Sequence, residues 1–128
     1  MRTAVVALSL SIGLSSAAVA DDLLLGGSLF AFPRARIVCQ FFNGGSQPVR
    51  IINPRIFDQF GTAFPLVINQ CDDTPTLAVH RSCGIVVDNT EARSWSCKAR
   101  ISPNKENVRG VLDIRLADGT VMVNMELR

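Results

Sequence analysis

Four cysteines constrain the fold of this chain more than any other feature of its sequence. An even number of cysteines in a small exported chain is typical of a disulfide framework, and four cysteines allow three pairings. Cys71 and Cys83 flank the turn-rich stretch 72–76 and can close a local loop. Cys39 and Cys97 each lie in a short β-like run and can join distant strands. We therefore favour Cys71–Cys83 together with Cys39–Cys97.

A metal site formed by Cys71, His80, Cys83 and Cys97 is the competing interpretation. The spacing of these residues lacks the paired Cys-x-x-Cys that marks a zinc site. Thiols in an oxidising compartment are usually consumed in disulfides. We therefore expect no metal and no other cofactor.

The first twenty residues predict a secretory signal peptide. Arg2 supplies a positive start, residues 3–14 are apolar or small, and the small-x-small motif at 18–20 is followed directly by Asp21. The apolar run is shorter than the roughly 20 residues of a spanning helix, although an N-terminal membrane anchor is the alternative. We expect a signal peptide at 1–20 and no membrane span after its removal. The protein would then be periplasmic or secreted, and the absence of Asn-x-Ser/Thr sequons favours the bacterial periplasm.

Short β-branched and aromatic runs separated by Gly, Pro and Asn turns predict strands along the rest of the chain. We expect strands at 37–42, 49–57, 64–69, 83–88, 94–101, 108–116 and 120–127. Pro54 marks a bulge or an edge. Residues 21–33 are ambiguous and are compatible with a first strand broken by Gly26-Gly27. Helical periodicity is missing, so the sequence predicts an all-β, antiparallel sandwich of about seven strands in a single domain, 21–128.

The alternation of residues 108–116 is the clearest strand pattern. Val108, Gly110, Leu112, Ile114 and Leu116 occupy every second position, which predicts one buried face. The Asp-Gly pair at 118–119 predicts a hairpin to the last strand.

The cysteine motifs follow one another in a suggestive order. They are Cys39-x-x-x-Asn43, Ile56-x-Asp58-x-x-Gly61, Cys71 and Cys83 around a proline-containing turn, Ser96-Cys97-Lys98-Ala99, and Val108-Arg109-Gly110 leading into Asp118-Gly119. This order resembles a group of small exported bacterial four-cysteine proteins without an assigned role, over most of residues 37–128. The resemblance implies an immunoglobulin-like sandwich and brings no activity or functional residues. The chain departs from the group in the glycine-free turn at 74–76.

Large apolar side chains are expected in the core. Trp95 can fill it. Met122 and Met125 fall on opposite faces of one strand and are therefore a poor pair for copper, so we expect them to fill the core instead. The chain has seven phenylalanines, enough for one or two to form exposed contacts.

Catalytic groups are scarce, because the chain has one histidine and no tyrosine. A Ser-His-Asp set could draw on His80, Ser82 and Asp72 or Asp73, but no Gly-x-Ser-x-Gly elbow is present. The other carboxylates in turn-like segments are Asp88, Glu91 and Glu106, which read as solvated acids. We therefore expect no enzymatic activity.

The chain has thirteen basic and eleven acidic residues, so its net charge is small and does not indicate binding to nucleic acid. Most basic residues are arginines, and we expect them to lie on a solvent-exposed face. The alternative is that they line a patch that binds an acidic partner or a glycan. The arginines concerned are Arg34, Arg36, Arg50, Arg55, Arg109 and Arg115.

The sequence favours an exported, non-catalytic interaction or structural module with an unknown protein or glycan partner and an open oligomeric state. One alternative is an inhibitor or binder of a secreted enzyme that acts through the Cys71–Cys83 loop. A second is a small hydrolase using His80. A third is a surface-appendage subunit, although residues 21–33 are its only candidate donor strand.

Overall fold

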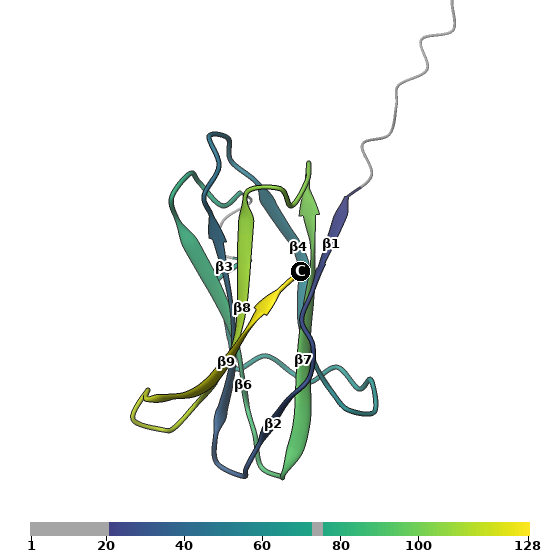
Figure 1. Cartoon of the computed structure of the whole chain (residues 1–128), viewed down its shortest axis with the longest axis vertical. Coiled ribbons are helices and arrows are strands. Elements are labelled where there is room, and N and C mark those ends of the chain that lie inside the picture. The colour runs from purple at the N-terminus through teal and green to yellow at the C-terminus, as the bar shows by residue number, and fades with distance from the viewer. Residues whose placement is uncertain (1–20, 73–75) are drawn as a thin grey trace, which may run out of the picture.

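The computed structural model describes residues 21–72 and 76–128, and in these residues it contains strands and no helix (Figure 1). The strands are β1 (Asp22–Leu25), β2 (Leu29–Ala31), β3 (Arg36–Asn43), β4 (Arg50–Asp58), β5 (Ile68–Asn69), β6 (Ser82–Asp88), β7 (Arg93–Ser102), β8 (Val108–Arg115) and β9 (Val121–Leu127). The expected signal peptide at 1–20 lies outside the described residues. Within them, no helix is long and apolar enough to cross a membrane.

Two antiparallel sheets form the sandwich. In sheet A, β1 and β2 pair with one edge of β7 and β4 pairs with the other. Sheet B has the order β5-β6-β3-β8-β9. The predicted all-β antiparallel sandwich is thus confirmed, with nine strands in the described residues rather than about seven. The two additional strands are β1 and β2, which come from the ambiguous stretch 21–33.

The central strands follow the immunoglobulin order, in which the second and fifth strands pair in one sheet and the third and sixth in the other. Here β3 pairs with β6 and β4 pairs with β7. The edges differ from that order. The N-terminal strands β1 and β2 occupy the place beside β7 that belongs to the C-terminal strand of an immunoglobulin domain, whereas β8 lies beside β3.

The strand expected at 64–69 is much shorter in the structure, where only β5 remains. The backbone N–H of Phe64 donates to Ile56 in sheet A, whereas that of Val67 donates to Val86 in sheet B. The segment therefore crosses from the edge of one sheet to the edge of the other, and it cannot pair continuously with either.

The core lies between the two sheets, because alternate side chains of each strand point inward. Trp95, Cys97, Ala99 and Ile101 of β7 are all buried, and Trp95 is only 1% exposed, as its predicted core role requires. The inward residues of β3 are Ile37, Cys39 and Phe41, and those of β8 are Val108, Gly110, Leu112 and Ile114.

The β8–β9 hairpin departs from two expectations. Leu116 is exposed because it lies past the end of β8, where its backbone N–H donates to Thr120 across the turn. Met122 is 52% exposed, so the prediction that it fills the core is wrong, whereas Met125 is half-buried. The reason is visible in Figure 1, where the hairpin extends away from the sandwich.

Two disulfides link the chain as the cysteine spacing suggested. Cys39 on β3 is bonded to Cys97 on β7 and so joins the two sheets. Cys71 is bonded to Cys83 at the base of the loop before β6. The alternative metal site is wrong, because all the cysteines that it needs are in disulfides. Moreover, no group of three or more potential metal ligands lies together in the described part of the chain.

The two ends of the described chain meet beside β1. Leu25 and Arg128 exchange a pair of backbone hydrogen bonds of 2.8 and 2.9 Å, and Figure 1 shows the C-terminus next to β1. The chain then passes through Gly26-Gly27 and continues as β2 along the same edge of β7. Pairing between Leu25 and Arg128 thus connects the edge of sheet A to the last strand of sheet B.

Candidate functional site

The outer face of sheet A carries a group of positive and apolar side chains, which we call the basic face: Leu23, Leu25, Arg55, Phe57, Lys98 and Arg100. Strand register brings them together. Arg100 of β7 lies opposite Leu23, and Lys98 lies between Leu25 and Arg55. Lys98 and Arg100 alternate with buried residues of β7, so they point to solvent.

An irregularity in β4 determines which way Arg55 points. In a regular strand, side chains two residues apart share a face, so Arg55 would lie on the same side as Ile51. The register shifts between Ile52 and Arg55, and Asn53 there has a φ of 52°. As a result Ile56 is fully buried and Arg55 is exposed. The bulge or edge predicted from Pro54 is confirmed on both counts.

The basic face is hollowed at its centre. A surface depression of about 390 Å³ is lined by most of the basic face together with Asn53 and Ala99. At its wall the Lys98 ammonium lies 4.6 Å from the centre of the Phe57 ring, and Arg55 Nε donates to Asn53 Oδ1 at 3.1 Å. Neither contact neutralises a positive charge.

Carboxylates pair with basic residues elsewhere in the molecule. The arginines in ion pairs are Arg36, Arg93, Arg109 and Arg115. Within 21–72 and 76–128, no ion pair involves Arg55, Lys98 or Arg100. The basic face therefore presents three positive charges that are in no ion pair within the described part of the chain, beside leucines that are each 47% exposed.

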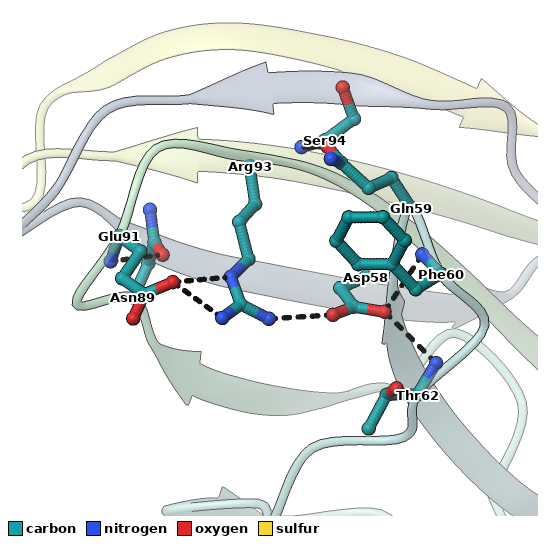
Figure 2. Close-up of polar contacts among 8 residues, drawn as sticks. All are labelled: Asp58, Gln59, Phe60, Thr62, Asn89, Glu91, Arg93 and Ser94. Atoms are coloured by element: carbon teal, nitrogen blue, oxygen red, sulfur yellow. Dashed lines mark hydrogen bonds and ion pairs between the residues drawn. The ribbon is translucent and has the colours of Figure 1, made fainter.

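The buried carboxylate of Asp58 is the centre of a second polar cluster (Figure 2). Its Oδ1 accepts hydrogen bonds from the backbone N–H groups of Phe60 and Thr62, and its Oδ2 accepts one from Arg93 at 2.7 Å. Arg93 also donates two hydrogen bonds to Glu91. Both carboxylate oxygens of Asp58 are engaged, so the cluster ties the turn after β4 to the start of β7.

The ionisation of Asp58 follows from these contacts. Burial by itself would raise the pKa of Asp58. The hydrogen bonds from Thr62 and Phe60 and the positive charge of Arg93 outweigh burial and hold that pKa below its ordinary value of 3.8. Glu91, aided by Asp58, raises the pKa of Arg93 above its ordinary value although burial opposes it. Both groups are therefore charged at neutral pH, and the cluster is a fixed ion pair that stabilises two turns.

The residues of the hydrolase hypothesis lie apart from this cluster. His80 is an exposed loop residue with a φ of 57°, and its backbone N–H donates to Asn43. Ser82 is exposed at the start of β6, and Asp72 accepts a hydrogen bond from Asn69. No side-chain hydrogen bond joins His80 to Ser82 or Asp72, both of which the structure describes. Asp73 lies outside the described residues.

The other acids from the sequence analysis are dispersed. Asp88 pairs with Arg36, and Glu91 pairs with Arg93. Glu106 is exposed in the turn before β8. The three carboxylates therefore have different surroundings and form no common site.

The Cys71–Cys83 loop is anchored at its base. Asn43 is fully buried, and its Nδ2 donates to the backbone oxygens of Leu77 and Gln47. Leu77 also pairs with Val49. The base of the loop is therefore fixed to the ends of β3 and β4, while residues 73–75 at its centre lie outside the described residues.

Sequence reasoning found only part of the basic face. It singled out Arg50 and Arg55 around Pro54, and the structure places both on sheet A, with Arg50 opposite Ser102. It did not single out Lys98 and Arg100, although their alternation with Cys97 and Ala99 was a usable signal. The remaining arginines of that group, Arg34, Arg36, Arg109 and Arg115, lie outside the basic face.

Comparisons of the chain with models of protein families, with curated proteins and with solved structures found no significant match. The geometry therefore defines the molecule by its class, a disulfide-bridged antiparallel sandwich with a basic outer face.

Proposed function

We propose that this protein is an exported, non-catalytic interaction module that binds an acidic protein partner through the basic face. The observation that supports the proposal is the concentration of Arg55, Lys98 and Arg100 around one depression, where none of them forms an ion pair with a described residue. Export to the periplasm or the extracellular medium is part of the proposal. It is supported by the two disulfides, which form and persist in oxidising compartments.

The spacing of the charges suits an extended acidic segment. Lys98 and Arg100 are two residues apart on one strand, a separation of about 7 Å. Acidic residues at alternate positions of an extended partner have the same separation. Arg55 and Arg100 can each accept a carboxylate in a bidentate pair, which adds geometric specificity to the attraction.

The apolar part of the basic face favours a protein over a glycan. Leu23 and Leu25 stand beside the cations and expose nearly half of their surface. An extended peptide that carries apolar side chains on the same face as its acidic ones can cover these leucines, whereas a polysaccharide backbone presents mainly hydroxyl groups. Covering exposed apolar surface adds about 25 cal/mol for each Å² removed from water.

The proposal is tested with peptides of alternating sequence that carry a fluorescent label. A Glu-Leu peptide should bind the purified protein more tightly than Gln-Leu and Lys-Leu peptides of the same length, and its binding should weaken as salt is raised. Arg100→Glu should weaken binding at least about tenfold, equivalent to about 1.4 kcal/mol. Arg81→Glu is the matched control, because Arg81 is also exposed but lies in the loop before β6.

Two outcomes would overturn the proposal. Equal binding by Arg100→Glu and Arg81→Glu would show that the basic face is not the contact surface. Tighter binding of an acidic polysaccharide such as alginate than of the Glu-Leu peptide would assign the face to a glycan.

A second candidate is inhibition of a secreted enzyme through the Cys71–Cys83 loop. It is favoured by the fixed base of that loop, where Asn43 donates a hydrogen bond to Leu77, because a base that is already ordered loses little entropy on binding. Replacing residues 72–76 by a Gly-Ser segment of equal length should abolish inhibition of a panel of secreted proteases and leave Glu-Leu peptide binding unchanged. Retained inhibition would remove this candidate.

A further inference from the structure

We propose that residues 21–31, which carry β1 and β2, form an exchangeable segment that a second copy of the chain can take up in place of its own. The exchange would give a dimer in which each basic face combines residues of two copies. The proposal stands independently of what the basic face binds, because it concerns the origin of Leu23 and Leu25.

The ladders of the N-terminal segment form with a single strand. Both β1 and β2 pair with β7, while the next strand, β3, belongs to the other sheet. Besides these ladders, Leu25 pairs with Arg128, Lys105 donates to Asp22 and Leu23, and Asn89 donates to Ala31. Opening the segment therefore breaks these contacts as well as the ladders, and it leaves the strand pairing within sheet B and the β4–β7 pair intact.

The edge that the segment would leave is specific for its own sequence. Leu24 and Ala31 insert into the core and are 3% and 1% exposed. Between them the chain passes Leu127 and Met125 so closely that Gly26 and Gly27 have no room for a side chain. A partner strand must supply the same apolar residues around the same two glycines. The occupant with that sequence is a second copy of this chain.

The connection to β3 is short and strained. It consists of residues 32–35, and Arg34 in it has a φ of 71°, a left-handed conformation that favours glycine. Pro33 has a fixed φ and disfavours helical conformations of Phe32 before it. An extended connection would let Arg34 adopt a negative φ. Short strained hinges of this kind favour exchange, because the strain is relieved when the segment swings to another copy.

The exchanged dimer keeps the ladders that β1 and β2 form in the closed chain, since the segment makes the same pairs with the β7 of its partner, and only the contacts of the connection 32–35 change. Its cost is the entropy of association, so exchange increases with protein concentration. The partner copy would supply Leu23 to the depression that Arg55 and Arg100 line. Two basic faces in one dimer would also strengthen binding to a partner with repeated acidic segments.

A disulfide trap distinguishes exchange from simple association. Leu23 and Arg100 are opposite each other on β1 and β7, so the variant Leu23→Cys/Arg100→Cys can form a disulfide across the ladder. The full exported chain is concentrated, warmed below its unfolding transition with a thiol–disulfide buffer, and separated into monomer and dimer by size. We expect the dimer to run as a covalent dimer on a non-reducing denaturing gel and the monomer as a single chain.

Each other outcome contradicts exchange. A dimer that separates into single chains on the gel would show that closed copies associate by their faces. A chain that stays monomeric at millimolar concentration after warming would show that the segment does not open.

The hinge is tested with a matched pair of glycine variants. Arg34→Gly relieves the left-handed strain in the closed chain and should lower the dimer fraction roughly tenfold, because about 1.4 kcal/mol changes an equilibrium by that factor. His80→Gly relieves the same kind of strain at a φ of 57° outside the hinge and should leave the dimer fraction unchanged. Equal effects of the two variants would contradict a role for the hinge.

Discussion

A Cβ atom on Gly26 would lie 2.2 Å from Cδ2 of Leu127, closer than two carbon atoms can approach without a shift. On its other side Leu127 faces Gly110, where a Cβ would lie 2.6 Å from Cδ1. Leu127 is therefore held between two glycines, one from the bend after β1 and one from β8. This contact packs the bend after β1 against the end of β9.

Gly26→Ala should destabilise the protein by about 1–3 kcal/mol, the usual cost of overpacking a filled core. Leu127 is 3% exposed, so it has little freedom to move away from a new methyl group. Urea unfolding followed by tryptophan fluorescence measures the effect, because Trp95 is the only tryptophan.

Gly84→Ala is the control for Gly26→Ala. A Cβ on Gly84 would meet its nearest neighbour at 3.5 Å, an ordinary contact, so the change in stability should be much smaller. In the double variant Gly26→Ala/Leu127→Ala, the new methyl group has room, and the two costs should be less than additive. Additive costs would contradict the close contact.

Asp58→Asn should make the free energy of unfolding depend less on pH in the acidic range. The pKa of Asp58 is below 3.8 in the folded protein, so its contribution is complete above the pKa of the unfolded chain. The contribution is lost as the pH falls from about 4 toward the lower folded pKa. The variant should be less stable than the original protein at pH 7, and the difference between their urea midpoints should be smaller at pH 3 than at pH 7.

Asp88→Asn provides the comparison for Asp58. The Asp88 carboxylate pairs with Arg36, but both side chains are more than half exposed. Exposed pairs contribute little to stability, so its urea midpoint should match that of the original protein at both pH values. An equal effect at both positions would mean that the contacts of Asp58 are not what stabilises the turn.

Local patterns predicted the strands because strand formation here is decided by alternation and by turns. Val108, Gly110, Leu112 and Ile114 are buried as the alternation predicted, although Asp113 between them is buried as well, and the two disulfides pair as their positions suggested. The role of Gly26-Gly27 was not predictable in this way. It depends on Leu127 and Met125, about a hundred residues away, and no local pattern contains that contact.

The basic face illustrates the same limit. Arg55 and Lys98 are neighbours only because β4 pairs with β7 in one register and is irregular after Ile52. Pro54 signalled the irregularity, but the face on which Arg55 emerges depends on how many residues the bulge contains. The exposure of Met122 likewise depends on how far the last hairpin extends from the sandwich.

Removing the Cys39–Cys97 disulfide should cost more than removing the other. Its cysteines are 58 residues apart, against 12 for Cys71–Cys83. Loop closure in the unfolded chain then predicts losses of about 4 and about 3 kcal/mol for the two double alanine variants. Urea unfolding of both variants under the same conditions measures the difference. Undiminished stability without Cys39 and Cys97 would contradict the importance of the bond between the sheets.

Export and oxidation should occur together. We expect the protein recovered from the periplasm or the medium to begin at Asp21, because the motif at 18–20 is typical of a signal-peptidase site, and to contain no free thiol. Intact-mass measurement before and after alkylation reads both properties at once. Deleting residues 2–20 should keep the chain in the reducing cytoplasm, where we expect four alkylated thiols and loss of the folded state. A chain that is recovered outside the cytoplasm with residues 1–20 still attached would instead indicate an N-terminal anchor.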